Sequence, residues 1–302
     1  MEDIGEIIQI MKINLGAIYR KALVKCEYCI FLRKKSNRIF IPNDMKSLIC
    51  YVTVTFNCPD FFKWQMNLLK KYEKEPYCQL VIDNSSENTK SFEIENICRE
   101  NDIAYVKVPE NPYSIKFKSP SRSHAAAVAW AKRHVLSHVH CKYVSFIDHD
   151  IFPIKKIDLL QKITESNQDI YGLLQDRRDA DGKGIWYIWP GFIIMKNTMI
   201  KNLDFTPIAS LGDTGAAMYK DVYSKINQNE MKFASSKLIN LYNHGDERFI
   251  STQRPECYGH PNTIEIIDDT WLHVCDGSGW LGVNISDKLG IVYDRLDSAL
   301  KG

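Results

Sequence analysis

The sequence contains no long uninterrupted run of apolar residues. Its first apolar stretches are interrupted by Lys12, Arg20, Lys21 and Lys25, whereas a helix that spans a bilayer needs about 20 consecutive, mainly apolar residues. A cleavable signal peptide also needs a continuous apolar segment. We therefore expect neither kind of segment, and a protein that is made and kept in the cytoplasm.

The sequence also lacks a large charge of either sign. Its 39 Lys and Arg residues against 37 Asp and Glu residues leave a net charge of +2, which argues against nucleic-acid binding through bulk electrostatics. A hydrophobic content of 45% and a charged content of 25% are typical of a globular protein. At 302 residues, the chain is long enough to bury a sizeable core.

The nine cysteines lack the dense spacing of a secreted disulfide framework, which favours a reducing compartment. Cys26 and Cys29 form a C-x-x-C pair, but no second pair or histidine pair completes a zinc site. No strand-then-helix context around them indicates thioredoxin chemistry either. We therefore interpret these two cysteines as residues on a helix surface.

Two common nucleotide-binding motifs are missing or misplaced. The sequence has no G-x-x-x-x-G-K-[ST] run, which excludes a P-loop kinase or ATPase. Residues 277–282 spell G-x-G-x-x-G, but too little chain follows them for the strand–helix–strand unit that a dinucleotide site requires. We therefore expect no dinucleotide cofactor.

The N-terminal segment is basic and helical in pattern. Residues 1–47 carry nine Lys or Arg against five Asp or Glu, and apolar residues recur at helical spacing over residues 5–35. We expect residues 1–46 to form a basic amphipathic extension. Such a helix either lies on an anionic membrane surface, with Phe31 and Leu32 as anchors, or packs on the protein body or on a second subunit.

From residue 47 the pattern alternates between strands and helices. The β-branched runs predict strands, and the runs with helical apolar spacing predict helices. The expected order is a strand over 48–56, a helix over 61–72, a strand over 79–83, a helix over 91–100, a strand over 103–108, a helix over 121–136 and a strand from residue 143. This alternation predicts an α/β fold with a mainly parallel central sheet flanked by helices.

The most informative run ends in two carboxylates. Asp148 and Asp150 close the apolar run over residues 143–150, and residues two apart in a strand point to the same face. Both can therefore reach one hard cation, and Mg²⁺ and Mn²⁺ are usually anchored by one or two carboxylates. The alternative is a solvated strand end. In open α/β sheets, ligands bind at the carboxyl ends of the strands, so the position favours a metal site.

The order of these features resembles the nucleotide-sugar glycosyltransferases of the GT-A fold, particularly the family 2 type. Four places carry the resemblance: the strand end over residues 53–57, the strand end over 81–86, the helix start over 122–124 and the Asp-x-Asp run over 146–150. The resemblance covers about residues 48–280. The donor-binding residues that it implies are Thr55, Asn57, Asp83, Arg122 and Asp148, with Asp83 accepting a hydrogen bond from the nucleotide base.

A second segment, over residues 271–280, resembles the C-terminal part of several GT-A enzymes. There, His273 would be the third metal ligand beside Asp148 and Asp150, and the backbone at Gly277 and Ser278 would approach the diphosphate. The segment departs from the family pattern His-x-x-Gly-x-x-Lys, because Gly277 comes one residue late and no lysine follows. A lone histidine on a strand is also compatible with a purely structural role.

The catalytic base and the acceptor site are assigned by placement. Inverting transfer needs a carboxylate that removes a proton from the acceptor hydroxyl. Asp213 is the first candidate, although it also suits the cap of a helix over 216–223, and Glu247 beside Asp246 is the alternative. The acceptor candidates lie in one aromatic run that could equally pack in the core: Trp186, Trp189 and Gly191.

The sequence thus predicts a metal-dependent glycosyltransferase of the hexosyltransferase class, with Mn²⁺ or Mg²⁺ as the cofactor. Its expected partners are a nucleotide-sugar donor, with UDP-sugar favoured by the resemblance, and a glycan or lipid-linked acceptor. We expect residues 47–302 to form the catalytic domain, with a nucleotide-binding half over 47–150 and an acceptor-binding half over 151–302. The two rival functions are a sugar-nucleotide nucleotidyltransferase and a noncatalytic, membrane-associated binding module.

Overall fold

The structure is a computed structural model. It describes residues 19, 22–42, 45–178, 182–207, 214–242, 246–250 and 263–275, together with residues 290, 292–294, 296 and 301.

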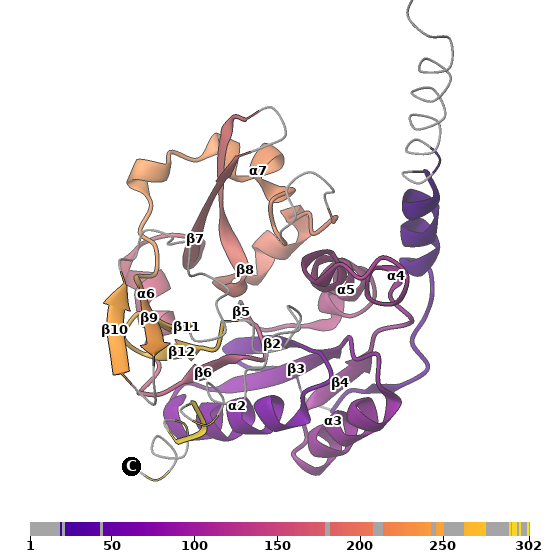
Figure 1. The fold of residues 1–302 in the computed structure, drawn as a ribbon, viewed down its shortest axis with the longest axis horizontal. Coiled ribbons are helices and arrows are strands. Elements are labelled where there is room, and N and C mark those ends of the chain that lie inside the picture. The colour runs from indigo at the N-terminus through magenta and orange to yellow at the C-terminus, as the bar shows by residue number, and fades with distance from the viewer. Residues whose placement is uncertain are drawn as a thin grey trace, which may run out of the picture.

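The centre of the protein is a seven-stranded sheet with the strand order β1-β4-β3-β2-β5-β8-β7 (Figure 1). Four strands in the middle run parallel: β4 (Ala104–Lys107), β3 (Tyr77–Asp83), β2 (Ile49–Thr55) and β5 (Tyr143–Ile147). All residues of β2 and β5 are buried, as expected for parallel strands covered on both faces. This arrangement confirms the predicted α/β fold.

The outer strands of this sheet are antiparallel to their neighbours. The short β1 (Ile39–Phe40) pairs with β4. At the other edge, β8 (Gly184–Lys196) pairs with β5, and β7 (Ile170–Arg178) pairs with β8. The long aromatic run therefore lies next to β5, which carries the predicted metal site at its end.

Helices cover both faces of the parallel strands. Figure 1 shows α2 (Pro59–Tyr72) and α3 (Asn88–Glu100) on one face and α5 (Pro120–His134) on the other. The apolar side of α2 packs Phe62 and Met66 against Val81. The alanine-rich side of α5 packs with Val52 on the opposite face, because small side chains let this helix approach the sheet closely.

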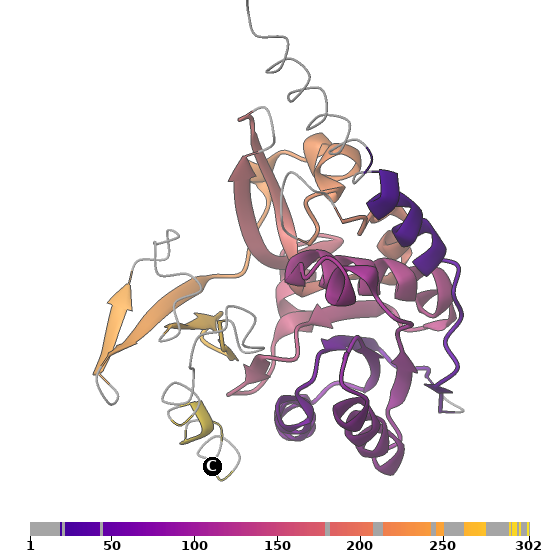
Figure 2. The ribbon, with the colours of Figure 1, turned by 45° about the vertical axis from the view of Figure 1, so that its right-hand side comes forward.

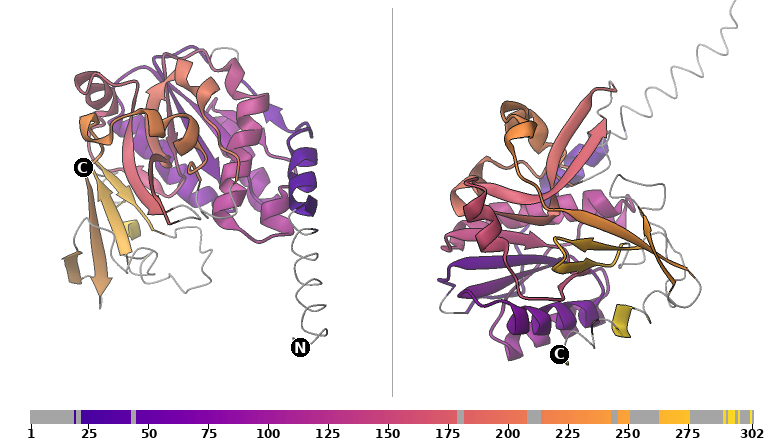
Figure 3. Two further views of the ribbon diagram at one scale, coloured as in Figure 1. Left: turned by 90° about the horizontal axis from the view of Figure 1, so that it is seen from above. Right: turned by 90° about the vertical axis from the view of Figure 1, so that its left-hand side faces the viewer.

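The second half forms a separate five-stranded antiparallel sheet, which Figures 2 and 3 show beside the central sheet. Its order is β10-β9-β11-β12-β6. The strands are β6 (Ile151–Pro153), β9 (Ser236–Tyr242), β10 (Asp246–Ile250), β11 (Thr263–Ile267) and β12 (Trp271–His273). Because β6 follows β5 after only three residues, the turn over 148–150 joins the two sheets.

Short helical segments complete the described chain. They are α4 (Pro112–Ile115), η1 (Leu136–His138), α6 (Leu159–Glu165), η2 (Asn197–Asn202), α7 (Met218–Asp221), η3 (Tyr223–Lys225) and η4 (Gln228–Glu230). The helix predicted over 216–223 is shorter than expected. One turn of α-helix, α7, is followed by the 3-10 turn η3, and Tyr223 is buried against Trp186.

The described end of the N-terminal segment packs on the body. Residues 22–31 are helical, and Phe31 is only 1% exposed within the main core. Glu27 forms an ion pair with Lys116, and the indole N–H of Trp130 donates a hydrogen bond to the carbonyl of Lys34. Phe31 therefore does not serve as a membrane anchor, because its ring is used in packing. Among the described residues, no helix has the length and apolar character needed to cross a bilayer.

Candidate active site

The two carboxylates lie in a tight turn at the carboxyl end of β5. The backbone N–H of Asp148 donates to the carbonyl of Gly191 on β8 at 2.9 Å, and the N–H of Ile151 donates to the carbonyl of Asp148 at 3.0 Å. The first bond continues the pairing of β5 with β8, and the second closes the turn. Asp148 and Asp150 are thus held where the parallel sheet meets the antiparallel one.

A buried glutamine on α2 holds this turn through hydrogen bonds to its backbone. The Gln65 side-chain amide donates to the carbonyls of Asp148 and Ile151, both at 2.8 Å. Its own oxygen accepts from the hydroxyl of Thr53 on β2 at 2.8 Å. The role of Gln65 was not predicted from the sequence. Its place as a polar residue on the apolar side of a helix, near Phe61 and Met66, is the signal that could have indicated it.

Asp148 is paired with a histidine from α5. The Nε2 atom of His124 lies 2.8 Å from Asp148 Oδ1. The hydroxyl of Thr214 donates to the carbonyl of Ser121, so its oxygen can accept from His124 Nδ1 at 3.1 Å. Burial alone would raise the pKa of Asp148, but His124 outweighs it, so the pKa is lowered and the carboxylate is ionised.

Asp150 faces a second histidine, on β12. The Nε2 atom of His273 lies 4.0 Å from Asp150 Oδ1, and its Nδ1 donates to Glu265 on β11 at 2.8 Å. Antiparallel pairing places Glu265 directly opposite His273. Burial would lower the pKa of His273, but the bond to Glu265 and the charge of Asp150 raise it. The N–H of Val274 donates to the carbonyl of Asp150 at 2.9 Å and ties β12 to the turn.

The chemistry of these donors fits a divalent cation. Asp148, Asp150 and His273 offer carboxylate oxygens and one imidazole nitrogen, a set that Mn²⁺ accepts well and Mg²⁺ accepts through its oxygens. Metal-binding histidines usually donate their other N–H to a carboxylate, and Glu265 provides that partner here. The imidazole must be neutral to bind a metal ion, so binding competes with its proton.

Gly191 allows the aromatic strand to approach the turn. A Cβ atom at this position would lie 2.7 Å from Asp148 Oδ2 and would overlap the indole ring of Trp189. The Trp189 ring in turn packs against the imidazole of His273, with ring centroids 5.1 Å apart. Trp186 lies further along β8, where it packs against Tyr223 and is only 8% exposed. The structure therefore brings Gly191 and the buried ring of Trp189, which is 9% exposed, next to the site, and it places Trp186 further away along the same strand.

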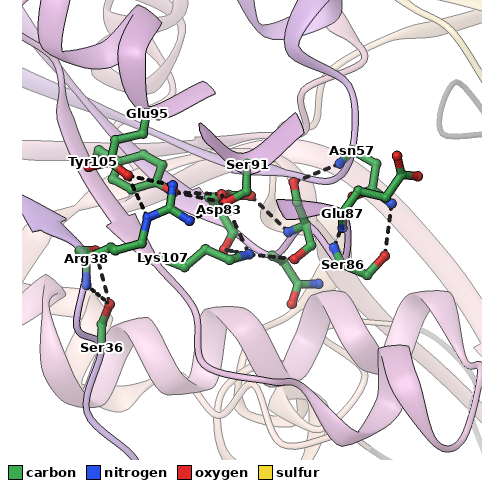
Figure 4. A network of polar contacts seen from close by, with 12 residues as sticks. Ser36, Arg38, Asn57, Asp83, Ser86, Glu87, Ser91, Glu95, Tyr105 and Lys107 are labelled. Carbon is green, nitrogen blue, oxygen red and sulfur yellow. Dashed lines mark hydrogen bonds and ion pairs between the residues drawn. The ribbon is translucent and has the colours of Figure 1, made fainter. Parts of the chain in front are cut away.

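The end of β3 carries a buried polar network around Asp83 (Figure 4). Asp83 is fully buried, and its Oδ1 accepts from the N–H of Ser85 at 2.9 Å. Its Oδ2 accepts from the hydroxyls of Ser91 and, at 2.7 Å, Tyr105, and Lys107 Nζ lies 3.6 Å away. These contacts give Asp83 a role in shaping the strand end. A contact with a nucleotide base stays a prediction.

The ends of β2 and β3 are joined through Asn57. Its backbone adopts a φ of 50°, a region in which asparagine is tolerated. Its side-chain oxygen accepts from the N–H groups of Ser86 and Glu87, both at 3.0 Å. Two residues before it, the buried hydroxyl of Thr55 has no hydrogen-bond partner among the described residues. Arg122 lies half-buried in the first turn of α5.

Several predicted site residues cannot be placed relative to this turn. Asp213, Gly277 and Ser278 lie outside the described residues. Glu247 lies in strand β10. The roles predicted for these four residues stay predictions.

Neither a protein-family model nor a curated protein sequence matches the chain. Among solved structures, the chain is similar to the mannosyltransferase PcManGT from Pyrobaculum calidifontis in complex with GDP-Man and Mn²⁺. That match has 15% identity and a TM-score of 0.41, and it covers 73% of this chain and 64% of that one. The chain is also similar to the mannosyltransferase Ktr4p from S. cerevisiae, with 13% identity, a TM-score of 0.37 and coverage of 60% and 66%.

A third similar structure is S. aureus TarS 1-349 in complex with UDP-GlcNAc, with 16% identity and a TM-score of 0.34. The match covers 51% of this chain and 46% of that one, so the chain spans less than half of that relative. With TM-scores below 0.5, these likenesses carry no argument about activity. The functional conclusion therefore depends on the geometry of the site.

Proposed function

We propose that this protein is a metal-dependent glycosyltransferase that moves a sugar from a nucleotide diphosphate donor to a hydroxyl of a glycan or lipid-linked acceptor. The observation that carries the proposal is that His273 Nε2 lies 4.0 Å from Asp150 Oδ1 in the turn that also carries Asp148, at the carboxyl edge of the parallel strands. In open α/β sheets, ligands bind in the crevice at this edge. Carboxylates beside an imidazole suit an ion that grips a diphosphate.

The residues of the turn prepare the site for a cation. Asp148 is ionised, and His273 turns Nε2 toward Asp150 because Nδ1 is bound to Glu265. When bound, Mn²⁺ or Mg²⁺ would neutralise the charge that grows on the departing diphosphate. Gln65 supports the backbone of the turn through its two hydrogen bonds to the carbonyls of Asp148 and Ile151.

We place the nucleoside of the donor at the ends of β2 and β3. Among the residues that the structure describes, the buried hydroxyl of Thr55 has no hydrogen-bond partner. Buried polar groups are normally hydrogen-bonded, so we infer that a ligand or water can satisfy it. Asn57 holds the loop that follows β3. The resemblance of the sequence favours a UDP-sugar as the donor, with Asp83 near the base.

The acceptor belongs on the side of β8 and the antiparallel sheet. Trp189 packs beside His273 and is 9% exposed, so we propose that only the exposed part of its ring contacts the acceptor sugar. Inverting transfer would use Asp213, or Glu247 on β10, as the base that takes the proton of the acceptor hydroxyl.

The test measures whether the protein cleaves a nucleotide-sugar donor. The purified full chain is incubated with a panel of UDP-sugars and GDP-sugars, with Mn²⁺, with Mg²⁺ or with a chelator, and the released nucleoside diphosphate is measured. We expect release from at least one donor, and only with a divalent ion. We expect Asp148→Asn and Asp150→Asn to reduce the release at least about 100-fold, the scale of losing one electrostatic contact to the leaving group.

A matched control separates the site from general charge effects. Asp169 forms an exposed ion pair with Lys196, so Asp169→Asn should leave the release unchanged. Nucleoside triphosphate consumption with a sugar phosphate would identify a nucleotidyltransferase instead. Binding of nucleotide without any turnover across the panel would identify a binding module, and either result would refute the proposal.

A further inference from the structure

Three cysteines converge at the amino edge of the parallel strands, opposite the candidate active site. Cys50 on β2 and Cys78 on β3 are direct neighbours in the parallel register, and Cys141 lies two residues before β5, on the other side of β2. The three sulfur atoms all lie within 4.8 Å of one another. The sulfurs of Cys78 and Cys141 are 3.5 Å apart.

A fourth donor atom completes the cluster. The carbonyl oxygen of Met45 lies 3.3 Å from the sulfur of Cys141 and 3.8 Å from that of Cys78. In a tetrahedral zinc site, bonds of about 2.3 Å to sulfur and about 2.1 Å to oxygen place two sulfurs about 3.8 Å apart and a sulfur and an oxygen about 3.6 Å apart. The three spacings among Cys78, Cys141 and Met45 lie close to these values, and the sulfur of Cys50 lies within 4.8 Å of the other two sulfurs.

The cluster is buried but lies beside a cavity. A thiol loses its proton when it binds a metal ion. Cys50 and Cys141 are nearly fully buried, at 0% and 3% exposure, yet Cys141 lines an open cavity of about 670 Å³ together with His140. The cavity gives an ion a path to the cluster.

We propose that Cys50, Cys78 and Cys141 bind one thiophilic d¹⁰ metal ion, Zn²⁺, with the Met45 carbonyl in the fourth position. Zn²⁺ closed off by sulfur ligands is typical of structural sites. The ion would tie β2, β3 and the start of β5 to the loop at residue 45. Because the cluster lies at the opposite end of these strands from Asp148, it is independent of the proposed transferase activity.

The experiment measures metal binding by the reduced full chain. The protein is stripped with a chelator under reducing, oxygen-free conditions and is then titrated with Co²⁺, whose thiolate charge-transfer absorption reports sulfur ligands, and with Zn²⁺ in competition. We expect the thiolate signal to saturate at one sulfur-bound Co²⁺ per chain, apart from any Co²⁺ at the carboxylate site, and to be displaced by Zn²⁺. The midpoint of thermal unfolding should rise with Zn²⁺, since an ion that binds only the folded state stabilises it. We expect Cys78→Ser and Cys141→Ser to lose the thiolate signal.

Matched cysteine variants serve as controls. Cys275 lies with Glu265 and His273 in a second cluster, and Cys26 and Cys29 are exposed, so Cys275→Ser and the double variant Cys26→Ser/Cys29→Ser should keep the signal. Absence of a thiolate signal in the reduced wild-type chain would overturn the proposal, whether or not the variants fold. So would a signal that survives in folded Cys141→Ser, or a Cys78–Cys141 disulfide whose reduction does not restore binding.

Discussion

The substitution Gln65→Met tests whether one buried side chain holds the turn. Methionine has a similar length and helix propensity, so the change removes polar atoms with little loss of packing. The structure loses three hydrogen bonds: two buried ones, from the Thr53 hydroxyl and to the carbonyl of Ile151, and a partly buried one to the carbonyl of Asp148. At about 1 kcal/mol for each bond, we expect the free energy of unfolding to fall by about 3 kcal/mol.

Urea denaturation followed by circular dichroism measures this change, with the slope of the transition checked for two-state behaviour. The control is Gln161→Met on α6, where the side chain bonds only to exposed Glu165, and which should change the free energy by less than about 0.5 kcal/mol. A loss at Gln65 no larger than that of the control would refute the reasoning. Binding of Mn²⁺ should also weaken in Gln65→Met, because the turn then loses its support.

Three further outcomes follow from the same contacts. Gly191→Ala places a methyl group 2.7 Å from Asp148 Oδ2, and we expect a cost of about 1–3 kcal/mol in unfolding free energy with weaker Mn²⁺ binding, measured by denaturation and calorimetry. Glu265→Gln removes the carboxylate that orients the imidazole of the site, so calorimetry should show Mn²⁺ affinity falling about 10–100-fold. Burial raises the pKa of Glu95, but the guanidinium groups of Arg38 and Arg99 lower it overall. The stability that these ion pairs provide should therefore be present above the unfolded pKa of about 4.3 and should be lost as the pH falls through the lower folded pKa. Glu95→Gln should lower the free energy of unfolding by about 2 kcal/mol at pH 7 and weaken its dependence on pH. A stability–pH profile of Glu95→Gln that overlays the wild type would contradict the last prediction.

The parallel core could be predicted because its signals are local. The strand predicted over 48–56 is β2 (Ile49–Thr55), and the helix predicted over 61–72 is α2 (Pro59–Tyr72). Buried parallel strands need continuous β-branched runs, and their crossover helices need one apolar side. These patterns also place Asp148 and Asp150 at a strand end, where the structure has them.

The residues that support Asp148 and His273 could not be predicted, because they lie far from them in the sequence and meet them only in the folded structure. Gln65 reaches Asp148 across 83 residues, and Glu265 meets His273 only because β11 and β12 are antiparallel neighbours. Nothing in a single sequence fixes the register of such strands. The helix start over 122–124 was predicted only as one of the places that carry the resemblance, and the contact between the His124 side chain and Asp148 was not predicted.

Polar residues at strand ends also proved ambiguous in the sequence. Asp83 and Asp148 both follow a buried strand, yet all the contacts of Asp83 are with its own protein neighbours, while Asp148 keeps 21% of its side chain exposed. The difference arises because Ser91 and Tyr105, from a helix and a neighbouring strand, lie over Asp83. Three-dimensional packing, and not residue type, separates a structural carboxylate from a candidate ligand.

The most direct test of the central claim is calorimetric titration of UDP into the full chain with and without Mn²⁺, in the wild type and in Asp150→Asn. A divalent ion held by Asp148, Asp150 and His273 predicts that UDP binds the wild type only when Mn²⁺ is present, and that Asp150→Asn loses this binding while keeping its fold. Equal binding of UDP with and without Mn²⁺, or metal-dependent binding that persists in Asp150→Asn, would contradict the account.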